Sequence, residues 1–150
     1  MSEKLLDLPA LNLITRYVSA LERGDHAAMK KLRSPDFVLD WVHSDAFADQ
    51  PVTQDGVNQF WTVWFGAFSE FDYEVTRTIA AETVVVIQWT FTGMQDGVLG
   101  IPIFDPPQEP TGKTIRLRGV SVFDIDNQLI TKETMYIDLA TLWVELGVTP

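Results

Sequence analysis

The sequence has no cysteine and only two histidines, His26 and His43. Without cysteine, the chain forms no disulfide, carries no thiolate nucleophile and offers no thiolate ligand to zinc or an iron–sulfur cluster. It also lacks a glycine-rich phosphate-binding fingerprint, a Gly-x-Ser-x-Gly nucleophile turn and a His-Glu-x-x-His zinc motif. We therefore expect neither a metal centre nor a serine or cysteine nucleophile.

Positive charge and long apolar runs are scarce as well. The chain has 11 basic against 21 acidic side chains, a formal charge of −10, which repels nucleic acids and anionic membranes. No run approaches 18 apolar residues, and Met1–Pro9 does not resemble a secretory signal, so we expect no membrane span and a cytoplasmic protein. At 150 residues and 46% hydrophobic content, residues 1–150 are expected to form one domain with a substantial core.

The first half of the chain has mostly helical patterning. Apolar residues recur at helical spacing from Pro9 to the stop signal at Gly24, and Asp25 is a cap candidate for a short second helix. Phe37–His43 alternates like a strand. A third helix is expected over roughly Gly56–Phe68, capped by Gln54 or Asp55, and its wide aromatic face predicts burial on more than one side.

The second half switches to a period of two. Four strands and a closing helix are expected over Phe71–Ile79, Thr83–Thr92, Lys113–Asp124, Leu129–Asp138 and Leu139–Leu146. This order predicts an α+β fold, in which a strongly curved, mostly antiparallel sheet wraps around the N-terminal helices. The expected shape is a cone with a closed apolar end and an open mouth.

Asp138 is the first candidate for chemistry. It lies between the last strand and the last helix, where it caps that helix or, alternatively, faces an apolar pocket as a general acid/base. In the second case, surrounding aromatic side chains would raise its pKa. Glu133 lies five residues earlier, so an unbroken strand puts the two carboxylates on opposite faces. We therefore expect Glu133 on the outer face unless a bulge intervenes.

Other polar and aromatic residues allow two interpretations each. His43 is either hydrogen-bonded at a sheet edge or a proton-sharing partner of an acid, and Gln95 is either loop surface or a donor to an enolate oxygen. The tryptophans are core residues, or they line a site for a flat, ring-shaped ligand. The residues predicted to line the pocket are Tyr17, Trp41, His43, Trp61, Trp64, Trp89, Gln95, Phe104 and Tyr136.

Short segments spread over residues 8–147 together resemble a known family. They are Phe65-Gly66-Ala67-Phe68, Trp89…Gly93, Gly100-Ile101-Pro102, Pro110-Thr111-Gly112-Lys113 and Tyr136-Ile137-Asp138…Glu145-Leu146-Gly147. In this order they resemble the SnoaL-like polyketide cyclases of the nuclear-transport-factor-2-like superfamily. The resemblance implies a cone-shaped barrel, dimeric through its sheet, that closes rings by intramolecular aldol condensation without metal or cofactor.

The resemblance also implies roles for individual residues. Asp138 matches the position of the family's acid/base aspartate before the last helix. Gln95 replaces a histidine that the family often carries, and Phe104–Glu109 looks inserted before Pro110. Glutamine cannot exchange protons, although it can hold an oxygen.

Three functions follow as alternatives. The first is an acid/base enzyme acting on an apolar carbonyl compound through Asp138. The second is a non-catalytic protein that binds an apolar ligand, and the third is a dimerisation module whose cone is filled by its own side chains. Gly97–Glu109 is expected to act as a lid. The outer sheet face is expected to form a homodimer interface through Arg116, Arg118, Val120 and Val122.

Overall fold

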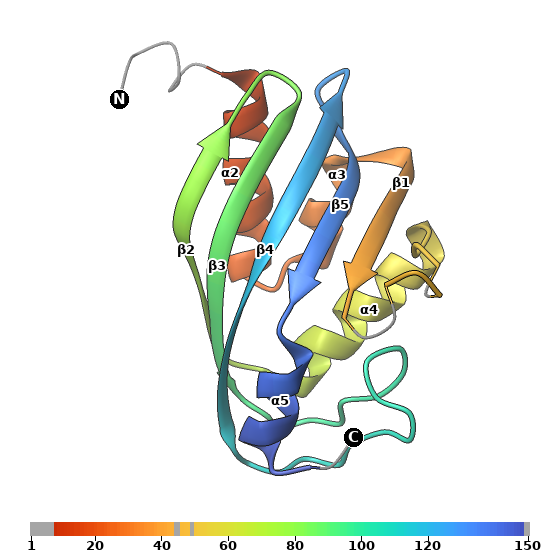
Figure 1. The fold of residues 1–150 in the computed structure, drawn as a ribbon, viewed down its shortest axis with the longest axis vertical. Helices are drawn as coiled ribbons and strands as arrows, with labels where there is room; N and C mark the ends of the chain where they lie inside the picture. The colour runs from red at the N-terminus through yellow and green to blue at the C-terminus, as the bar shows by residue number, and fades with distance from the viewer. Residues whose placement is uncertain (1–7, 44–45, 49, 149–150) are drawn as a thin grey trace.

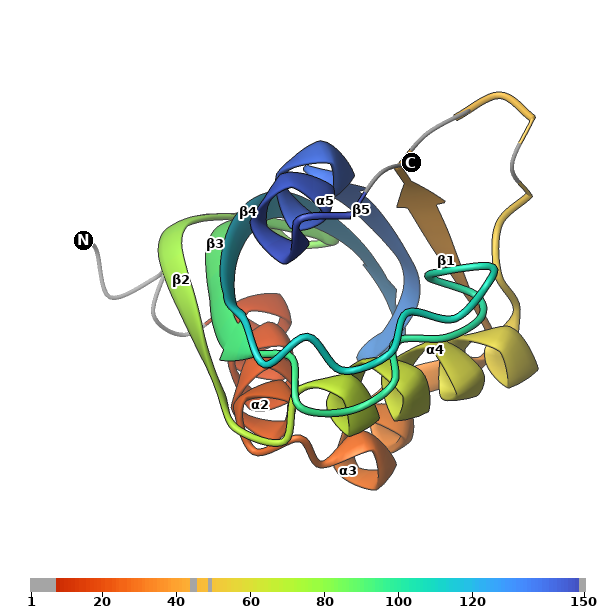
Figure 2. The same cartoon turned by 90° about the horizontal axis from the view of Figure 1, so that it is seen from below.

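The computed structural model describes residues 8–43, 46–48 and 50–148. Its five strands form one sheet in the order β1-β5-β4-β3-β2, and three helices cover one face of this sheet (Figure 1). The predicted α+β class, with a curved sheet around N-terminal helices, is confirmed. Viewed from below, the sheet is strongly curved, and α2, α3 and α4 lie across its concave side (Figure 2).

Two local signals shape the N-terminal helices. Helix α2 spans Pro9–Glu22 with proline in its first turn, where no intrahelical N–H is needed, and Gly24 follows at φ +64°. Helix α3 spans His26–Lys31, and the Asp25 side chain accepts a 3.1 Å hydrogen bond from the backbone N–H of Ala28. Both predictions are confirmed.

The strands are long and almost all antiparallel. Strand β1 pairs in parallel with β5, whereas the β2–β3, β3–β4 and β4–β5 pairs are antiparallel. The bounds are Arg33–Val42 for β1, Phe71–Ala80 for β2, Val84–Met94 for β3, Thr114–Asp126 for β4 and Leu129–Ile137 for β5. Strand β1 therefore begins four residues before the predicted Phe37, with a register shift after Arg33.

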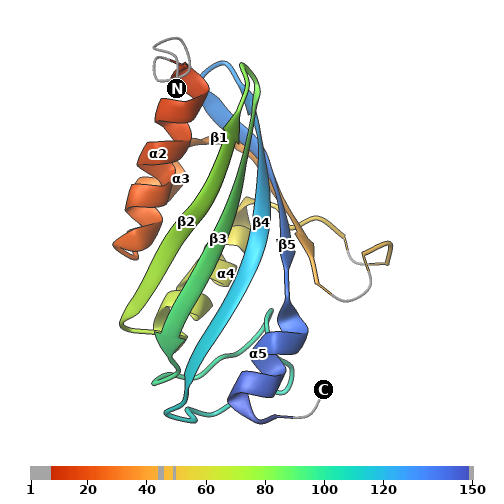
Figure 3. The ribbon, with the colours of Figure 1, turned by 60° about the vertical axis from the view of Figure 1, so that its left-hand side comes forward.

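Two further helices frame the open side and the end of the cone. Helix α4 spans Gln54–Ala67, so Thr53 is its cap residue and the predicted caps Gln54 and Asp55 lie within the helix. It buries Val57, Phe60, Trp61, Trp64 and Ala67. Helix α5 spans Leu139–Leu146 and packs against β4 at the end of the strands (Figure 3).

Bulges decide which side chains face inward. In β2 the pairing skips Thr76, so Ile79 turns outward with 54% of its surface exposed. A regular period of two would have placed it on the same face as Phe71 and Tyr73. In β5 the pairing skips Thr131, and both Ile130 and Glu133 are buried. From Glu133 onward the strand alternates regularly, which sets the direction of every later side chain.

Candidate functional site

A small cavity lies between the sheet and the helices, and its volume is about 20 Å³. This space holds roughly one water molecule. Helices α2 and α4 and strands β2, β3 and β5 contribute the lining, which consists of Leu21, Phe60, Trp61, Trp64, Tyr73, Trp89, Phe91, Glu133, Met135 and Ile137. The wall is thus almost entirely apolar and aromatic, with Glu133 as its one carboxyl group in the described part of the chain.

Glu133 is a buried carboxyl group with a strongly shifted pKa. Only 3% of its surface is exposed, and burial raises its pKa from 4.5 to about 7. A hydrogen bond with Ser121 and the positive charge of Arg33 offset part of this effect. Glu133 Oε1 has no hydrogen-bond partner in the protein. Near neutral pH this group therefore exists in both protonated and ionised forms, as a general acid/base requires.

Polar groups also surround Glu133 inside the core. Tyr17 is fully buried, and its pKa is raised by burial and then by the negative charge of Glu133. Arg33 is 4% exposed, and its Nη2 donates to His26 Nε2 at 2.9 Å, because a guanidinium has no acceptor atom. Burial, followed by the charge of Arg33, lowers the pKa of His26. Tyr17, Arg33 and Glu133 thus lie close enough inside the core to interact electrostatically, and His26 adjoins Arg33 at its edge.

The wall includes a buried donor without a partner. Trp61 is 4% exposed, and its indole nitrogen Nε1 has no hydrogen-bond partner although it is buried. An unpaired buried N–H is costly unless a ligand or a water accepts its hydrogen. Trp61 and Glu133 therefore supply a donor and an acid/base group from opposite sides of the cavity, α4 and β5.

The family model described as the SnoaL-like domain matches residues 14–133. The chain belongs to the SnoaL-like domain family. The predicted family resemblance is therefore confirmed, and the matched region includes four of the five strands and all of the cavity lining except Met135 and Ile137.

Solved structures share this SnoaL-like fold at low sequence identity. AclR from Streptomyces galilaeus, proposed to be a hydroxylase, is 23% identical with a TM-score of 0.75, covering 94% of this chain and 82% of AclR. A protein from Jannaschia sp. CCS1, proposed to be a SnoaL-like polyketide cyclase, is 19% identical with a TM-score of 0.76, covering 95% and 94%. TerC, co-crystallised with polyporic acid, is 14% identical with a TM-score of 0.68, covering 93% and 98%. No curated protein matches this chain.

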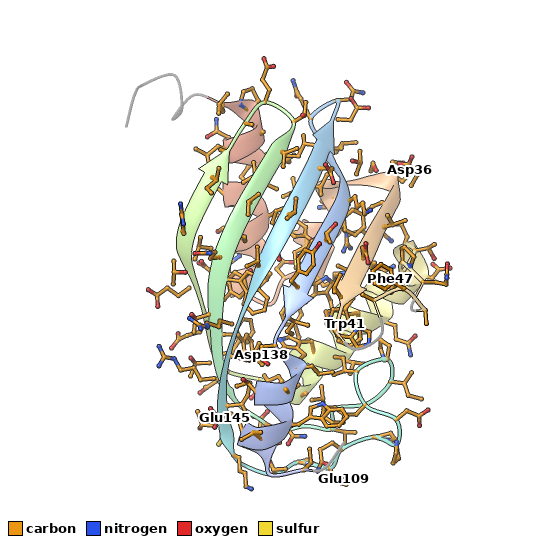
Figure 4. All side chains as sticks on the ribbon, viewed as in Figure 1. Asp36, Trp41, Phe47, Glu109, Asp138 and Glu145 are labelled. Atoms are coloured by element: carbon orange, nitrogen blue, oxygen red, sulfur yellow. The ribbon has the colours of Figure 1, made fainter. Side chains whose placement is uncertain are left out.

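Asp138 does not face the interior of this SnoaL-like domain. It lies at the junction of β5 and α5 (Figure 4), where its side chain is exposed and accepts hydrogen bonds from the backbone N–H of Thr141, at 3.1 Å, and from the Thr141 hydroxyl. These bonds, the hydroxyl first, lower the pKa of Asp138. The expectation of a buried Asp138 with a raised pKa is therefore wrong, because regular alternation after Glu133 turns it outward.

Two further predicted pocket residues share the outer side with Asp138. His43 and Tyr136 line an open hollow on the outer sheet face together with Asp138. Half of the Tyr136 surface is exposed. The His43 ring stacks on Trp41 at 3.8 Å, and its Nδ1 donates to the Trp41 carbonyl oxygen at 2.9 Å. The structure thus gathers these residues outside the cone, away from the inner cavity.

Gln95 holds a loop instead of facing the cavity. It is fully buried, and its amide nitrogen donates to the carbonyl oxygens of Gly97, Gln108 and Glu109 at 3.1 to 3.2 Å. Its side-chain oxygen accepts from the backbone N–H and the hydroxyl of Thr111 at 3.1 and 2.8 Å. Its hydrogen-bonding capacity is used by the loop, so the expected donation to an enolate oxygen is not available here.

The remaining predicted pocket residues divide between wall and core. Trp61, Trp64 and Trp89 line the cavity. Trp41 packs edge-on against Phe60 at 5.2 Å, outside the cavity wall. Phe104 packs on Trp143 of α5 at 5.8 Å, in the loop before β4. The tryptophan positions on α4 and β3 are therefore the ones that meet around Glu133.

Glu133 is the residue that sequence reasoning assigned to the wrong face. The signal for its true position is its phase, because Glu133, Met135 and Ile137 alternate on one face of β5 and the last two are apolar. A carboxylate in phase with apolar strand residues predicts burial, whereas Asp138 is out of phase with them.

The described residues contain neither a cluster of metal ligands nor a membrane-spanning helix. Within residues 8–43, 46–48 and 50–148, no group of three or more His, Cys, Asp or Glu side chains is placed to hold a metal ion. None of the helices in this part of the chain is long and apolar enough to cross a lipid bilayer.

Proposed function

We propose that this SnoaL-like protein is a cofactor-free acid/base enzyme that uses Glu133 to move a proton next to a carbonyl group of an apolar small molecule. The observation that carries the proposal is a buried carboxyl group, with a pKa of about 7, on the wall of an aromatic cavity. A general base is most effective when its pKa lies near the working pH. Perturbed carboxyl groups in apolar cavities are concentrated at functional sites.

The proposed step is a proton transfer. The ionised Glu133 carboxylate takes a proton from the carbon beside the carbonyl, the C–H electron pair forms the enolate double bond, and the carbonyl oxygen receives the negative charge. The free indole N–H of Trp61 then stabilises that oxygen. Protonated Glu133 returns its proton to the product, so no net proton is gained or lost. Aldol cyclisation, isomerisation and dehydration all use this step.

The cavity wall supports an uncharged, flat substrate. Trp61, Trp64 and Trp89 offer broad apolar faces, and a charged ligand would lose its hydration without gaining a matching partner. At about 20 Å³ the cavity is smaller than any such substrate. We therefore propose that binding moves the side chains of the wall apart. TerC, which shares the fold, was co-crystallised with a small molecule, polyporic acid.

The experiment follows binding and product formation with a hydroxylated polycyclic ketone. We expect Glu133→Gln to bind the ketone but to lose turnover by about 10²- to 10⁴-fold, the usual contribution of a positioned acid/base. Asp138→Asn is the matched control, because it makes the same carboxyl-to-amide change on the outer face, and it should keep turnover. Full turnover in Glu133→Gln rejects the proposal. Binding without any product in the wild type favours the non-catalytic ligand-binding protein.

We also propose that two copies associate through the outer sheet face. Tyr136 is half exposed there, Val120 and Val122 are partly buried, and Arg118 adds a charged edge. Tyr136→Glu places a charge on this surface without touching the cavity, so it should convert a sedimenting dimer into a monomer. A wild-type protein that sediments only as a monomer at micromolar concentration contradicts this assembly.

A further inference from the structure

Trp89 and Ser121 form a hydrogen-bonded pair beside Glu133. The Trp89 indole Nε1 donates to Ser121 Oγ at 3.0 Å, and both residues are buried, with 4% and 0% of their surfaces exposed. An indole nitrogen is a donor only, so the serine oxygen accepts this bond. Ser121 lies opposite Met135 in the β4–β5 pairing, which places it diagonally beside Glu133 on the inward face, and its hydroxyl is one of the groups that lower the pKa of Glu133. Because its oxygen accepts from Trp89, the Ser121 hydroxyl can direct its hydrogen toward the Glu133 carboxyl group.

Gly119 makes this arrangement possible. It lies opposite Trp89 in the β3–β4 pairing, two residues before Ser121 on the same inward face. A Cβ atom on Gly119 would lie 2.4 Å from Cζ2 and 2.8 Å from Cη2 of Trp89, and 2.6 Å from the backbone oxygen of Tyr136. Because the indole ring occupies the space that a side chain would fill, it reaches across β4 to the Ser121 hydroxyl.

We propose that Gly119, Trp89 and Ser121 act as positioning residues that orient the Glu133 carboxylate and favour its ionised form. The proposal rests on the proposed role of Glu133 as the base, but its predicted effect is on Glu133 itself. Burial alone would hold this carboxyl group in the protonated form, which cannot accept a proton. A donated hydrogen bond stabilises the ionised form, and neighbouring bonds strengthen one another in a low-dielectric interior. The pair therefore keeps a buried acid usable as a base near neutral pH.

The proposal predicts an ordered series of pKa values for Glu133. Removing a hydrogen bond to an ionised group raises a carboxyl pKa by about one to two units. Ser121→Ala should therefore show this full shift, whereas Trp89→Phe, which keeps a ring but not the donor, should show a smaller upward shift. Ser121→Thr keeps the hydroxyl and should restore the wild-type value. Ser34→Ala removes another buried serine, whose hydroxyl donates to Asp36, and should change nothing at Glu133.

The measurement is a ¹³C NMR titration of side-chain carboxyl groups in the whole ligand-free protein, with the Glu133 resonance identified by its loss in Glu133→Gln. The proposal is supported if the pKa of Glu133 increases from the wild type to Trp89→Phe and again to Ser121→Ala, and if Ser121→Thr restores the wild-type pKa. An unshifted pKa in Ser121→Ala, or an equal shift in Ser121→Thr, overturns it. If Ser121→Ala does not fold, an unshifted pKa in Trp89→Phe overturns it instead. Turnover is not needed for this titration, so a fully active Glu133→Gln would reject the proposed function and leave this result standing.

Discussion

Glu133 and Asp138 lie five residues apart and point to opposite sides of the sheet. Glu133 is buried beside an aromatic cavity, and its pKa is raised to about 7. Asp138 is exposed at the start of α5, and hydrogen bonds from Thr141 lower its pKa. The same chemical group thus has a raised pKa in the buried environment and a lowered pKa in the exposed one.

The pH dependence of stability should carry the signature of Glu133. Its pKa is higher in the folded state, about 7, than the ordinary 4.5, so the folded protein binds more protons between these values. The resulting stabilisation is fully present below pH 4.5 and is lost as pH rises through 7. At 1.36 kcal/mol per unit, the loss is about 3 kcal/mol.

Chemical denaturation at several pH values measures this loss, with Glu133→Gln as the reference. His26 contributes in the opposite direction, because its pKa is lowered and its stabilisation is lost as pH falls. The difference between wild type and Glu133→Gln therefore isolates the carboxyl group. Parallel stability curves for the two proteins between pH 4.5 and 7 would contradict the raised pKa.

Asp138 should behave as a helix cap. Asp138→Ala removes the acceptor for the Thr141 backbone N–H and should lower the free energy of unfolding by about 1 kcal/mol. Asn is an equally good cap residue, so Asp138→Asn should stay close to the wild type. Urea denaturation checks both variants. An equal loss in Asp138→Asn would show that the charge, and not the cap, stabilises this end of α5.

Gly119 and Gly66 form a matched pair for substitution by alanine. In Gly119→Ala the new Cβ collides with the Trp89 ring, so we expect a loss of about 1–3 kcal/mol and altered tryptophan fluorescence. Gly66 lies in α4 with open space around it, so Gly66→Ala should stabilise the protein by about 0.5–1 kcal/mol. Thermal denaturation of both variants tests the expectation, and an unaffected Gly119→Ala would mean that Trp89 moves freely.

Gln95 should control the order of the loop between β3 and β4. Gln95→Ala removes five part-buried hydrogen bonds to the Gly97–Thr111 segment, at a cost of about 3 kcal/mol or more. Hydrogen exchange should accelerate across this segment. Gln108→Ala, which removes one exposed side-chain bond, is the control. Equal exchange in the two variants would reject Gln95 as the residue that holds the loop.

The sequence predicted the elements better than the site, for a physical reason. The helix stop at Gly24 and the period of two over Thr83–Thr92 are local signals, and the structure agrees with them. Which face of β5 turns inward depends on its pairing with β4 and on a bulge at Thr131, neither of which is local.

Gln95 is a second case in which contacts with distant residues decide the role of a side chain. A glutamine in a Gly- and Pro-rich segment gives no indication that residues 13 to 16 positions away will use its amide. Asp138 shows the opposite case, because its local cap signal was correct and the resemblance to a family aspartate favoured the pocket instead.

The pH dependence of turnover tests the central claim, that Glu133 is the interior base, most directly. With a polycyclic ketone substrate, kcat/KM of the wild type should rise with pH and level off above a pKa of about 7, as Glu133 ionises. Asp138→Asn should give the same profile, and Glu133→Gln should lose both the rise and most of the rate. A rise that persists unchanged in Glu133→Gln would contradict the account.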